Sequence, residues 1–145
     1  MSRELLIERV IELVESETAI SKSNLINSSF CGRTTDYRQG IYFLYNTKKD
    51  VIYVGKVGSK LNTSLYDRMY GNGPIASHQG DVWWNEVEEG RFHRFSDLND
   101  QQILQIERLA IFGKGQPIYN DSYTTNNDAV EILKLLPPIT TKEEA

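Results

Sequence analysis

Two short segments, Gly40-Ile41-Tyr42 and Tyr53-Val54-Gly55, constrain the fold of this chain more than any other part of it. Each lies in a run of β-favouring residues, and a polar segment at residues 46–50 separates the two runs. The pattern predicts a β-hairpin. Because side chains alternate between the faces of a strand, Tyr53 is expected to share a face with Gly55.

The two tyrosines of this hairpin have two interpretations. Gly55 lacks a side chain and leaves room for a close approach by backbone or ligand, and Lys56 follows it directly. Tyr42, Tyr53 and Lys56 together could therefore line a polar pocket within an apolar sheet. The alternative is that both tyrosines are ordinary strand aromatics, and the hairpin alone leaves both interpretations open.

Two predicted helices each carry one charged residue on an otherwise apolar stripe. The first covers residues 62–70, and Arg68 falls on the stripe formed by Leu61, Leu65 and Met69. The second covers residues 99–112, with N-cap candidates Ser96, Asp97 and Asn99. Glu107 lies in the middle of its inner face, which consists of Ile103, Ile106, Ala110 and Ile111.

A carboxylate in an apolar setting forms an ion pair, binds a metal or takes up a proton. Arg68 and Glu107 on neighbouring helices could simply pair with each other. The other interpretation is that Glu107 holds a cation while Arg68 holds an anionic group of a substrate. Helical periodicity does not distinguish between these two interpretations.

Taken in order, these elements resemble the GIY-YIG nuclease superfamily. The resemblance covers residues 38–122 and ends with Pro117-Ile118-Tyr119-Asn120, which follows the helix that carries Glu107. Two departures stand out: Val54 occupies the place of the isoleucine in the family name, and residues 57–60 lengthen the path to Arg68.

The resemblance implies hydrolysis of a phosphodiester bond in DNA with one divalent cation, Mg²⁺ or Mn²⁺. Glu107 would be the only direct protein ligand of that cation, and water and phosphate oxygens would complete its shell. Arg68 would bind the phosphate and stabilise the charge that develops in the transition state.

Tyr42 would take the proton from the attacking water, with Lys56 or the metal favouring its phenolate. Tyr53 would orient the water or the scissile phosphate, and Asn120 would anchor the loop after the metal helix or bond near the site. A histidine follows the arginine in some restriction-enzyme relatives. For His78, which lies further along, the resemblance leaves a chemical role open.

The resemblance and the residue pattern together predict an α/β (α+β) fold, in which a three-stranded mixed or antiparallel sheet is flanked by helices. At 145 residues the chain is expected to form one domain, with the nuclease core at residues 38–122. Helices at residues 2–16 and 126–136 are additions to this core, residues 18–38 a loop, and residues 91–95 the third strand. Residues 82–89 are ambiguous between strand and helix.

Composition excludes several classes of protein. No apolar run is long enough for a membrane span, so we expect no membrane association. Cys31 is the only cysteine, which excludes an internal disulfide or a zinc cluster and makes a cytoplasmic location the default. The net charge of −4 argues against tight non-specific adhesion to DNA.

Among the activities that the resemblance implies, a compact acidic domain with an added N-terminal helix favours a restriction-type or phage-type endonuclease that cuts both strands of DNA. Such cleavage needs two active sites, so a homodimer is expected, with an interface at residues 2–16 or at Trp83-Trp84. Two alternatives remain: a nickase or structure-specific nuclease, and a catalytically silent module that binds nucleic acid or protein on a nuclease scaffold.

Overall fold

A computed structural model describes residues 2–32, 35–60, 63–70, 78–120 and 129–137. At its centre is a sheet of four strands, all paired antiparallel in the order β1-β4-β2-β3. The strands are β1 (Ile20–Ser21), β2 (Gly40–Tyr45), β3 (Val51–Val57) and β4 (Glu89–Arg94). The prediction of an α+β fold, in which helices surround a small sheet, is confirmed.

The predicted strand count of three is wrong, because β1 adds a fourth strand within the expected loop at residues 18–38. Ile20 pairs with Gly90, and Ser21 pairs with Glu89. A strand of two residues is too short to leave a period-2 pattern in the sequence, and only its partner β4 reveals it. The mixed alternative is also wrong, because every pairing is antiparallel.

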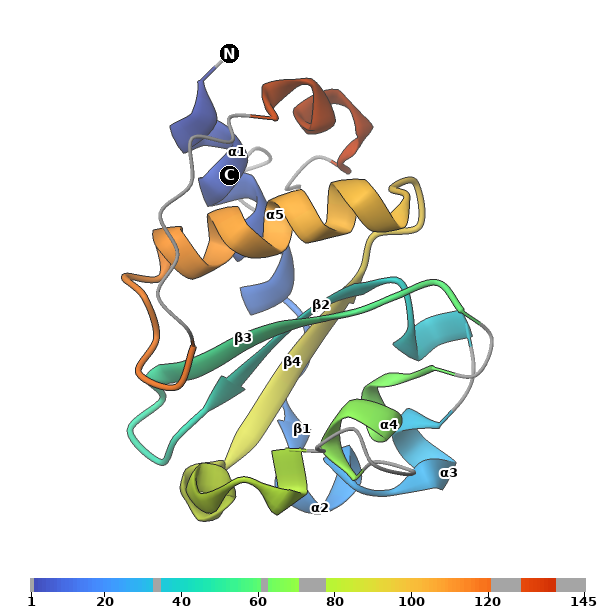
Figure 1. The fold of residues 1–145 in the computed structure, drawn as a ribbon, viewed down its shortest axis with the longest axis vertical. Helices are drawn as coiled ribbons and strands as arrows, with labels where there is room; N and C mark the ends of the chain where they lie inside the picture. The colour runs from blue at the N-terminus through green and yellow to red at the C-terminus, as the bar shows by residue number, and fades with distance from the viewer. Residues whose placement is uncertain (1, 33–34, 61–62, 71–77, 121–128, 138–145) are drawn as a thin grey trace.

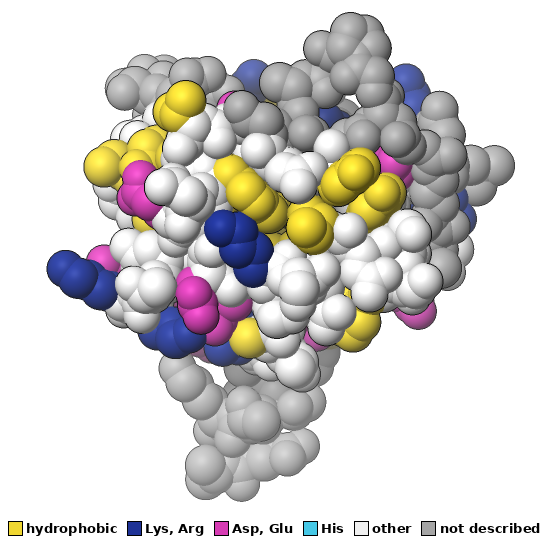
Figure 2. All heavy atoms as spheres, turned by 90° about the horizontal axis from the view of Figure 1, so that it is seen from below, with side chains coloured by type: hydrophobic (Ala, Val, Ile, Leu, Met, Phe, Trp, Pro, Cys, Tyr) yellow, Lys and Arg dark blue, Asp and Glu magenta, His cyan; other side chains and the backbone are white. Residues whose placement is uncertain are grey.

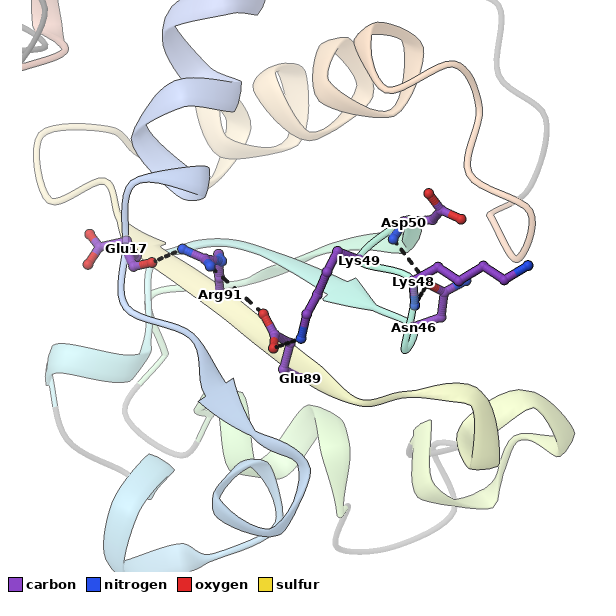
Figure 3. A network of polar contacts seen from close by, with 7 residues as sticks. All are labelled: Glu17, Asn46, Lys48, Lys49, Asp50, Glu89 and Arg91. Atoms are coloured by element: carbon purple, nitrogen blue, oxygen red, sulfur yellow. Dashed lines mark hydrogen bonds and ion pairs between the residues drawn. The ribbon is translucent and has the colours of Figure 1, made fainter.

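The predicted hairpin is formed by β2 and β3, and its turn is closed by one side chain. Asn46 Oδ1 accepts hydrogen bonds of 3.0 Å from the backbone amides of Lys48 and Asp50 (Figure 3). In the same view, Lys49 reaches across to Glu89 on β4, with 2.6 Å between Nζ and Oε1. These contacts fix the register that positions both tyrosines.

One face of the sheet is covered by α1 (Arg3–Glu15), α5 (Asp100–Gly113) and the 3-10 helix η4 (Val130–Leu135) (Figure 1). The apolar stripe of α1 is buried within the chain, against α5 and the sheet; its members are Leu6, Ile7, Val10, Leu13 and Val14. The buried stripe is therefore not available for the homodimer interface that was expected at residues 2–16.

The other face of the sheet is covered by short elements. They are α2 (Lys22–Leu25), α3 (Ser28–Cys31), η1 (Thr35–Tyr37), α4 (Leu65–Met69), η2 (His78–Gly80) and η3 (Val82–Glu86). Figure 2 views the molecule from this end, where apolar, acidic and basic side chains are mixed. A second hydrophobic cluster lies here and includes Tyr42, Leu44, Leu65, Met69 and Trp84.

Several predicted boundaries change. The expected helix at residues 126–136 is the shorter 3-10 helix η4, and residues 126–128 lie outside the described residues. The arginine helix α4 begins after the N-cap Ser64 rather than at residue 62, which also lies outside them. The ambiguous residues 82–89 form η3 and the first residue of β4.

The side chains of both tryptophans of η3 pack against their own chain, since Trp84 belongs to the second hydrophobic cluster and Trp83 packs against that cluster. The pair therefore gives no reason to expect a dimer interface. In the part of the chain that the structure describes, no helix has the length and apolarity needed to cross a membrane.

Candidate active site

The hairpin register places Tyr42 directly opposite Gly55. A Cβ atom added at Gly55 would overlap with the Cζ and Oη atoms of Tyr42, so the phenol occupies the space that the missing side chain leaves. Gly55 is therefore required for the position of the Tyr42 hydroxyl.

We expect Gly55→Ala to displace the Tyr42 phenol and to destabilise the fold by about 1–3 kcal/mol, the usual range for overpacking a tight site. Cleavage rate and melting temperature report the two effects. Gly58→Ala is the matched control, because its added Cβ would meet only Asp100, at an ordinary distance of 3.7 Å. Equal behaviour of the two variants would contradict this packing argument.

Six of the seven predicted site residues line one pocket of about 200 Å³. They are Tyr42, Tyr53, Lys56, Arg68, His78 and Glu107. The pocket lies beside β3, the edge strand of the sheet, where α5 on one face meets α4 and η2 on the other. Strand, helix and turn residues that are up to 65 positions apart in sequence thus meet at one sheet edge.

Arg68 reaches this pocket from α4, which is anchored by its N-cap and by its apolar side chains. Ser64 caps the helix by accepting a hydrogen bond from the Asp67 amide, and Leu65 and Met69 are fully buried. The Nε atom of Arg68 is buried and has no hydrogen-bond partner among the described residues. An unsatisfied buried guanidinium nitrogen is costly, and a bound anion would satisfy it.

Glu107 points into the pocket from α5. Among the described residues no ion pair joins it to Arg68, so the simple pairing interpretation does not hold. Burial raises the pKa of Glu107 to about 7, although Lys56, Arg108 and Arg68 act in the opposite direction. The ionised form of a desolvated carboxylate is stabilised by a cation that replaces its lost hydration.

The raised pKa of Glu107 has a consequence for stability. The folded carboxyl binds its proton more tightly than the unfolded one, so folding becomes less favourable as pH rises from about 4.5 to about 7. Above that window in EDTA, we expect Glu107→Gln to be more stable than wild type by roughly 1–3 kcal/mol. Near pH 4.5 the difference should disappear.

Urea unfolding at pH 4.5 and pH 8 measures this effect. The exposed Glu88 supplies the control, since Glu88→Gln should leave the free energy of unfolding unchanged at both pH values. A Glu107→Gln gain that is equal at both pH values would show that the carboxyl is not desolvated.

Tyr42 and His78 form a short polar contact in the pocket, with 2.6 Å between Oη and Nε2. Burial raises the pKa of Tyr42 well above its usual value, while Arg68 acts to lower it. The phenol is therefore protonated at neutral pH and needs a partner that can take its proton. Burial lowers the pKa of His78, which keeps the imidazole neutral and able to accept.

Lys56 was expected to favour the Tyr42 phenolate. It lines the pocket, but its main electrostatic effect is on Glu107, whose pKa it lowers more than Arg108 or Arg68 does. The charge of Lys56 thus acts on the carboxylate, and His78 is hydrogen-bonded to the phenol.

The seventh predicted residue, Asn120, lies outside this pocket and binds the edge of the sheet. Its Oδ1 accepts from the Val54 amide at 2.8 Å, and its Nδ2 donates to the Val54 carbonyl at 2.9 Å. These bonds occupy the free backbone edge of β3, and the Tyr119 amide adds a third bond to the Ile52 carbonyl. The geometry fits the anchoring role rather than a chemical one.

A second hollow of about 230 Å³ adjoins the first and shares Tyr53, His78 and Glu107 with it. Its remaining lining residues are Asp81, Trp83, Ile111, Tyr119 and Asn120. Among the described residues, this hollow has no lysine or arginine in its lining, whereas the first has Lys56 and Arg68. Charge therefore directs an anionic group into the first pocket.

Sequence analysis missed Asp81, and it named Trp83 and Tyr119 without assigning them to this region. Asp81 contacts His78, with 3.0 Å between Oδ2 and Nδ1. Trp83 stacks on Tyr53 and on Tyr119, with ring centroids 5.3 Å and 5.0 Å apart. The His-x-x-Asp spacing of residues 78–81 was a usable signal for Asp81. No sequence signal placed Trp83 beside Tyr119, because the contact depends on the fold.

The residues of the pocket fit a single divalent cation held by one protein ligand. No group of three or more histidine, cysteine, aspartate or glutamate side chains with metal-binding geometry occurs within the described ranges. Glu107 alone would hold the cation, and a shell completed by water and phosphate oxygens is typical of Mg²⁺. The unsatisfied Arg68 nitrogen fits the phosphate that such a shell requires.

Comparison of the chain with models of protein families, with curated proteins and with solved structures finds no match. The functional interpretation therefore depends on the geometry of the pocket.

Proposed function

We propose that this protein is a metal-dependent DNA endonuclease, a hydrolase that cleaves phosphodiester bonds. The observation that carries the proposal is the convergence in one pocket of a hydrogen-bonded phenol–imidazole pair, a buried guanidinium whose Nε atom has no hydrogen-bond partner among the described residues, and a desolvated carboxylate. The pair is Tyr42 with His78, the guanidinium is that of Arg68, and the carboxylate is that of Glu107. Phosphodiester hydrolysis needs these three functions together.

In the proposed reaction the scissile phosphate binds beside Arg68, whose Nε donates to a non-bridging oxygen. A water molecule attacks phosphorus and gives its proton to Tyr42 Oη, while the phenol proton passes to His78 Nε2 over the 2.6 Å contact. The new P–O bond forms as the bond to the leaving oxygen breaks. The leaving oxygen takes a proton from solvent, and His78 later releases its own.

Mg²⁺ or Mn²⁺ at Glu107 would supply Lewis-acid stabilisation of the phosphate charge. Lys56 keeps the Glu107 carboxyl more acidic than burial alone would allow, which favours the ionised form that binds a cation. Tyr53 contacts the imidazole of His78, with 4.5 Å between ring centroids, and limits its movement.

Cleavage of one strand at a time is the form of the reaction that the fold supports best. The apolar stripe of α1 and the ring of Trp84 are both buried within the chain, so neither provides an interface for a second copy. A single active site cuts one strand per binding event. We therefore expect nicked circles to accumulate before linear plasmid appears, and a double-strand cutter would produce linear DNA directly.

Supercoiled plasmid DNA incubated with the protein tests the proposal. Nicking is expected with Mg²⁺ or Mn²⁺ and not with EDTA. The competing function, a silent binding module, has some support in the mixed charges of the face in Figure 2 and in the net charge of −4. Binding of DNA in a gel-shift assay without metal-dependent cleavage of duplex or single-stranded DNA would favour that function and overturn the proposal.

A further inference from the structure

Asp81 completes a line of three polar groups that begins at Tyr42. His78 Nε2 lies 2.6 Å from the phenol oxygen, and His78 Nδ1 lies 3.0 Å from Asp81 Oδ2. The His78 side chain is only 12% exposed, whereas Asp81, at the rim, is 33% exposed. The imidazole thus has a different partner at each nitrogen.

The chemistry of the carboxylate decides which nitrogen of His78 carries the proton. An ionised carboxylate only accepts hydrogen bonds, so Nδ1 must be protonated to face it. In the neutral ring Nε2 then has a lone pair directed at Tyr42, as a proton acceptor requires. With the proton on Nε2 instead, His78 would donate to the phenol oxygen and could not accept its proton.

We propose that Asp81 is a positioning residue that holds His78 in the Nδ1–H tautomer and so makes it the proton acceptor for Tyr42. The proposal rests on the proposed endonuclease function, because it assigns the acceptor of that reaction.

Backbone hydrogen bonds fix the turn that carries Asp81. Its backbone amide donates to the His78 carbonyl at 2.9 Å, and its carbonyl accepts from the Trp84 amide at 3.1 Å. These bonds close the turn between η2 and η3, so the two side chains leave the backbone on the same side of one turn. The charge of the carboxylate also offsets the effect of Arg68, which lowers the pKa of His78.

The aromatic contacts of η3 secure this turn against the rest of the site. Trp83 stacks on Tyr119 with ring planes only 8° apart, and the Tyr119 hydroxyl donates to Glu86 at the end of η3. Because Asn120 binds the edge of β3, η3 is connected to the same strand that carries Tyr53. Asp81 is therefore held relative to the tyrosines and not only relative to His78.

The chain contains an internal control for this arrangement. It has two histidines, and His93 on β4 makes a similar contact with Glu17, with 2.7 Å between Nδ1 and Oε2. His93 does not line either hollow of the site. A measurement that resolves both histidines can therefore compare the paired imidazole inside the site with the paired imidazole outside it.

Long-range ¹H–¹⁵N correlation NMR of the whole chain distinguishes the two tautomers, and His93→Gln assigns the spectrum. In wild type near pH 8 we expect His78 as the Nδ1–H form. In Asp81→Asn the amide NH₂ can donate to Nδ1, so we expect His78 to change to the Nε2–H form while His93 is unchanged. Glu17→Gln should affect His93 and leave both His78 and the cleavage rate as in wild type.

Under single-turnover conditions Asp81→Asn should cleave DNA 10²–10⁴-fold more slowly, the range for loss of a positioned base. Asp81→Glu retains a carboxylate and should recover part of that loss. The proposal is overturned if wild-type His78 is the Nε2–H form, or if Asp81→Asn keeps both the tautomer and the rate. A wild type that cleaves no DNA overturns the proposed function instead, and the tautomer measurement still decides whether Asp81 orients His78.

Discussion

Glu107→Gln is expected to reduce metal-dependent cleavage of DNA by at least about 10³-fold while the protein remains folded. Gln has the same shape as Glu but lacks the charge that binds a divalent cation. Loss of several kcal/mol of transition-state stabilisation corresponds to three or more factors of ten in rate. The raised pKa of Glu107 adds a second signature, because wild-type activity should fall as pH drops below about 7.

Single-turnover cleavage of an end-labelled duplex measures the loss of cleavage rate, and isothermal titration with Mn²⁺ measures the loss of cation binding. Glu88→Gln is again the matched control, since Glu88 is exposed and does not line the pocket. A Glu107→Gln variant that cleaves at the wild-type rate, or wild-type cleavage that persists in EDTA, would remove the carboxylate from the mechanism.

Tyr42→Phe is expected to slow the chemical step by 10²–10⁴-fold, the usual contribution of a general base, with little change in DNA binding. The ring still fills the space opposite Gly55, but the oxygen that contacts His78 is lost. The loss should therefore appear in the single-turnover rate at saturating protein, not in the concentration at which half of the DNA is bound.

Tyr45 provides a closely matched control on the same strand. It is also buried, but strand alternation places it in the hydrophobic cluster on the opposite face of the sheet. Tyr45→Phe removes one buried hydroxyl from β2 and should leave the cleavage rate within a few-fold of wild type. If the two phenylalanine variants are impaired equally, the effect comes from the strand and not from the Tyr42 oxygen.

The parts of the fold that the sequence predicted are those with a strong local pattern. The hairpin, the helix that covers one face and the helix of Glu107 each have a clear period or cap. For α5 the capping box of Asn99 and Gln102 sets the first turn, next to the predicted start. Short elements such as β1 and η3 have no such period: β1 is held by its pairing with β4, and η3 is held by the stacking of Trp83 on Tyr53 and Tyr119.

The candidate site likewise contains residues whose positions the sequence could predict and residues whose positions it could not. Tyr42, Tyr53, Arg68 and Glu107 stand in regular elements, so their faces could be deduced before the structure was known. His78 and Asp81 lie in a turn, and their distances to Tyr42 depend on how η2 packs against the sheet. The sequence patterns and the family resemblance therefore suggested the proposed base, anion site and metal ligand, whereas they left the role of His78 open.

The desolvation of Glu107 also required three-dimensional information. Helical periodicity left pairing with Arg68 and binding of a cation equally open. Among the described residues, no ion pair joins the two side chains and the Arg68 Nε atom has no hydrogen-bond partner. Two groups of opposite charge, held apart around one pocket, are better suited to a shared ligand than to each other.

The central claim is that this pocket hydrolyses DNA, and the most direct test is cleavage of supercoiled plasmid in parallel by wild type, Glu107→Gln and Tyr42→Phe, each purified in the same way. We predict that wild type converts the plasmid to nicked circles with Mg²⁺ and not with EDTA, while both variants leave it supercoiled over the same time. Equal cleavage by all three proteins, or no cleavage by wild type with either Mg²⁺ or Mn²⁺, would contradict the claim.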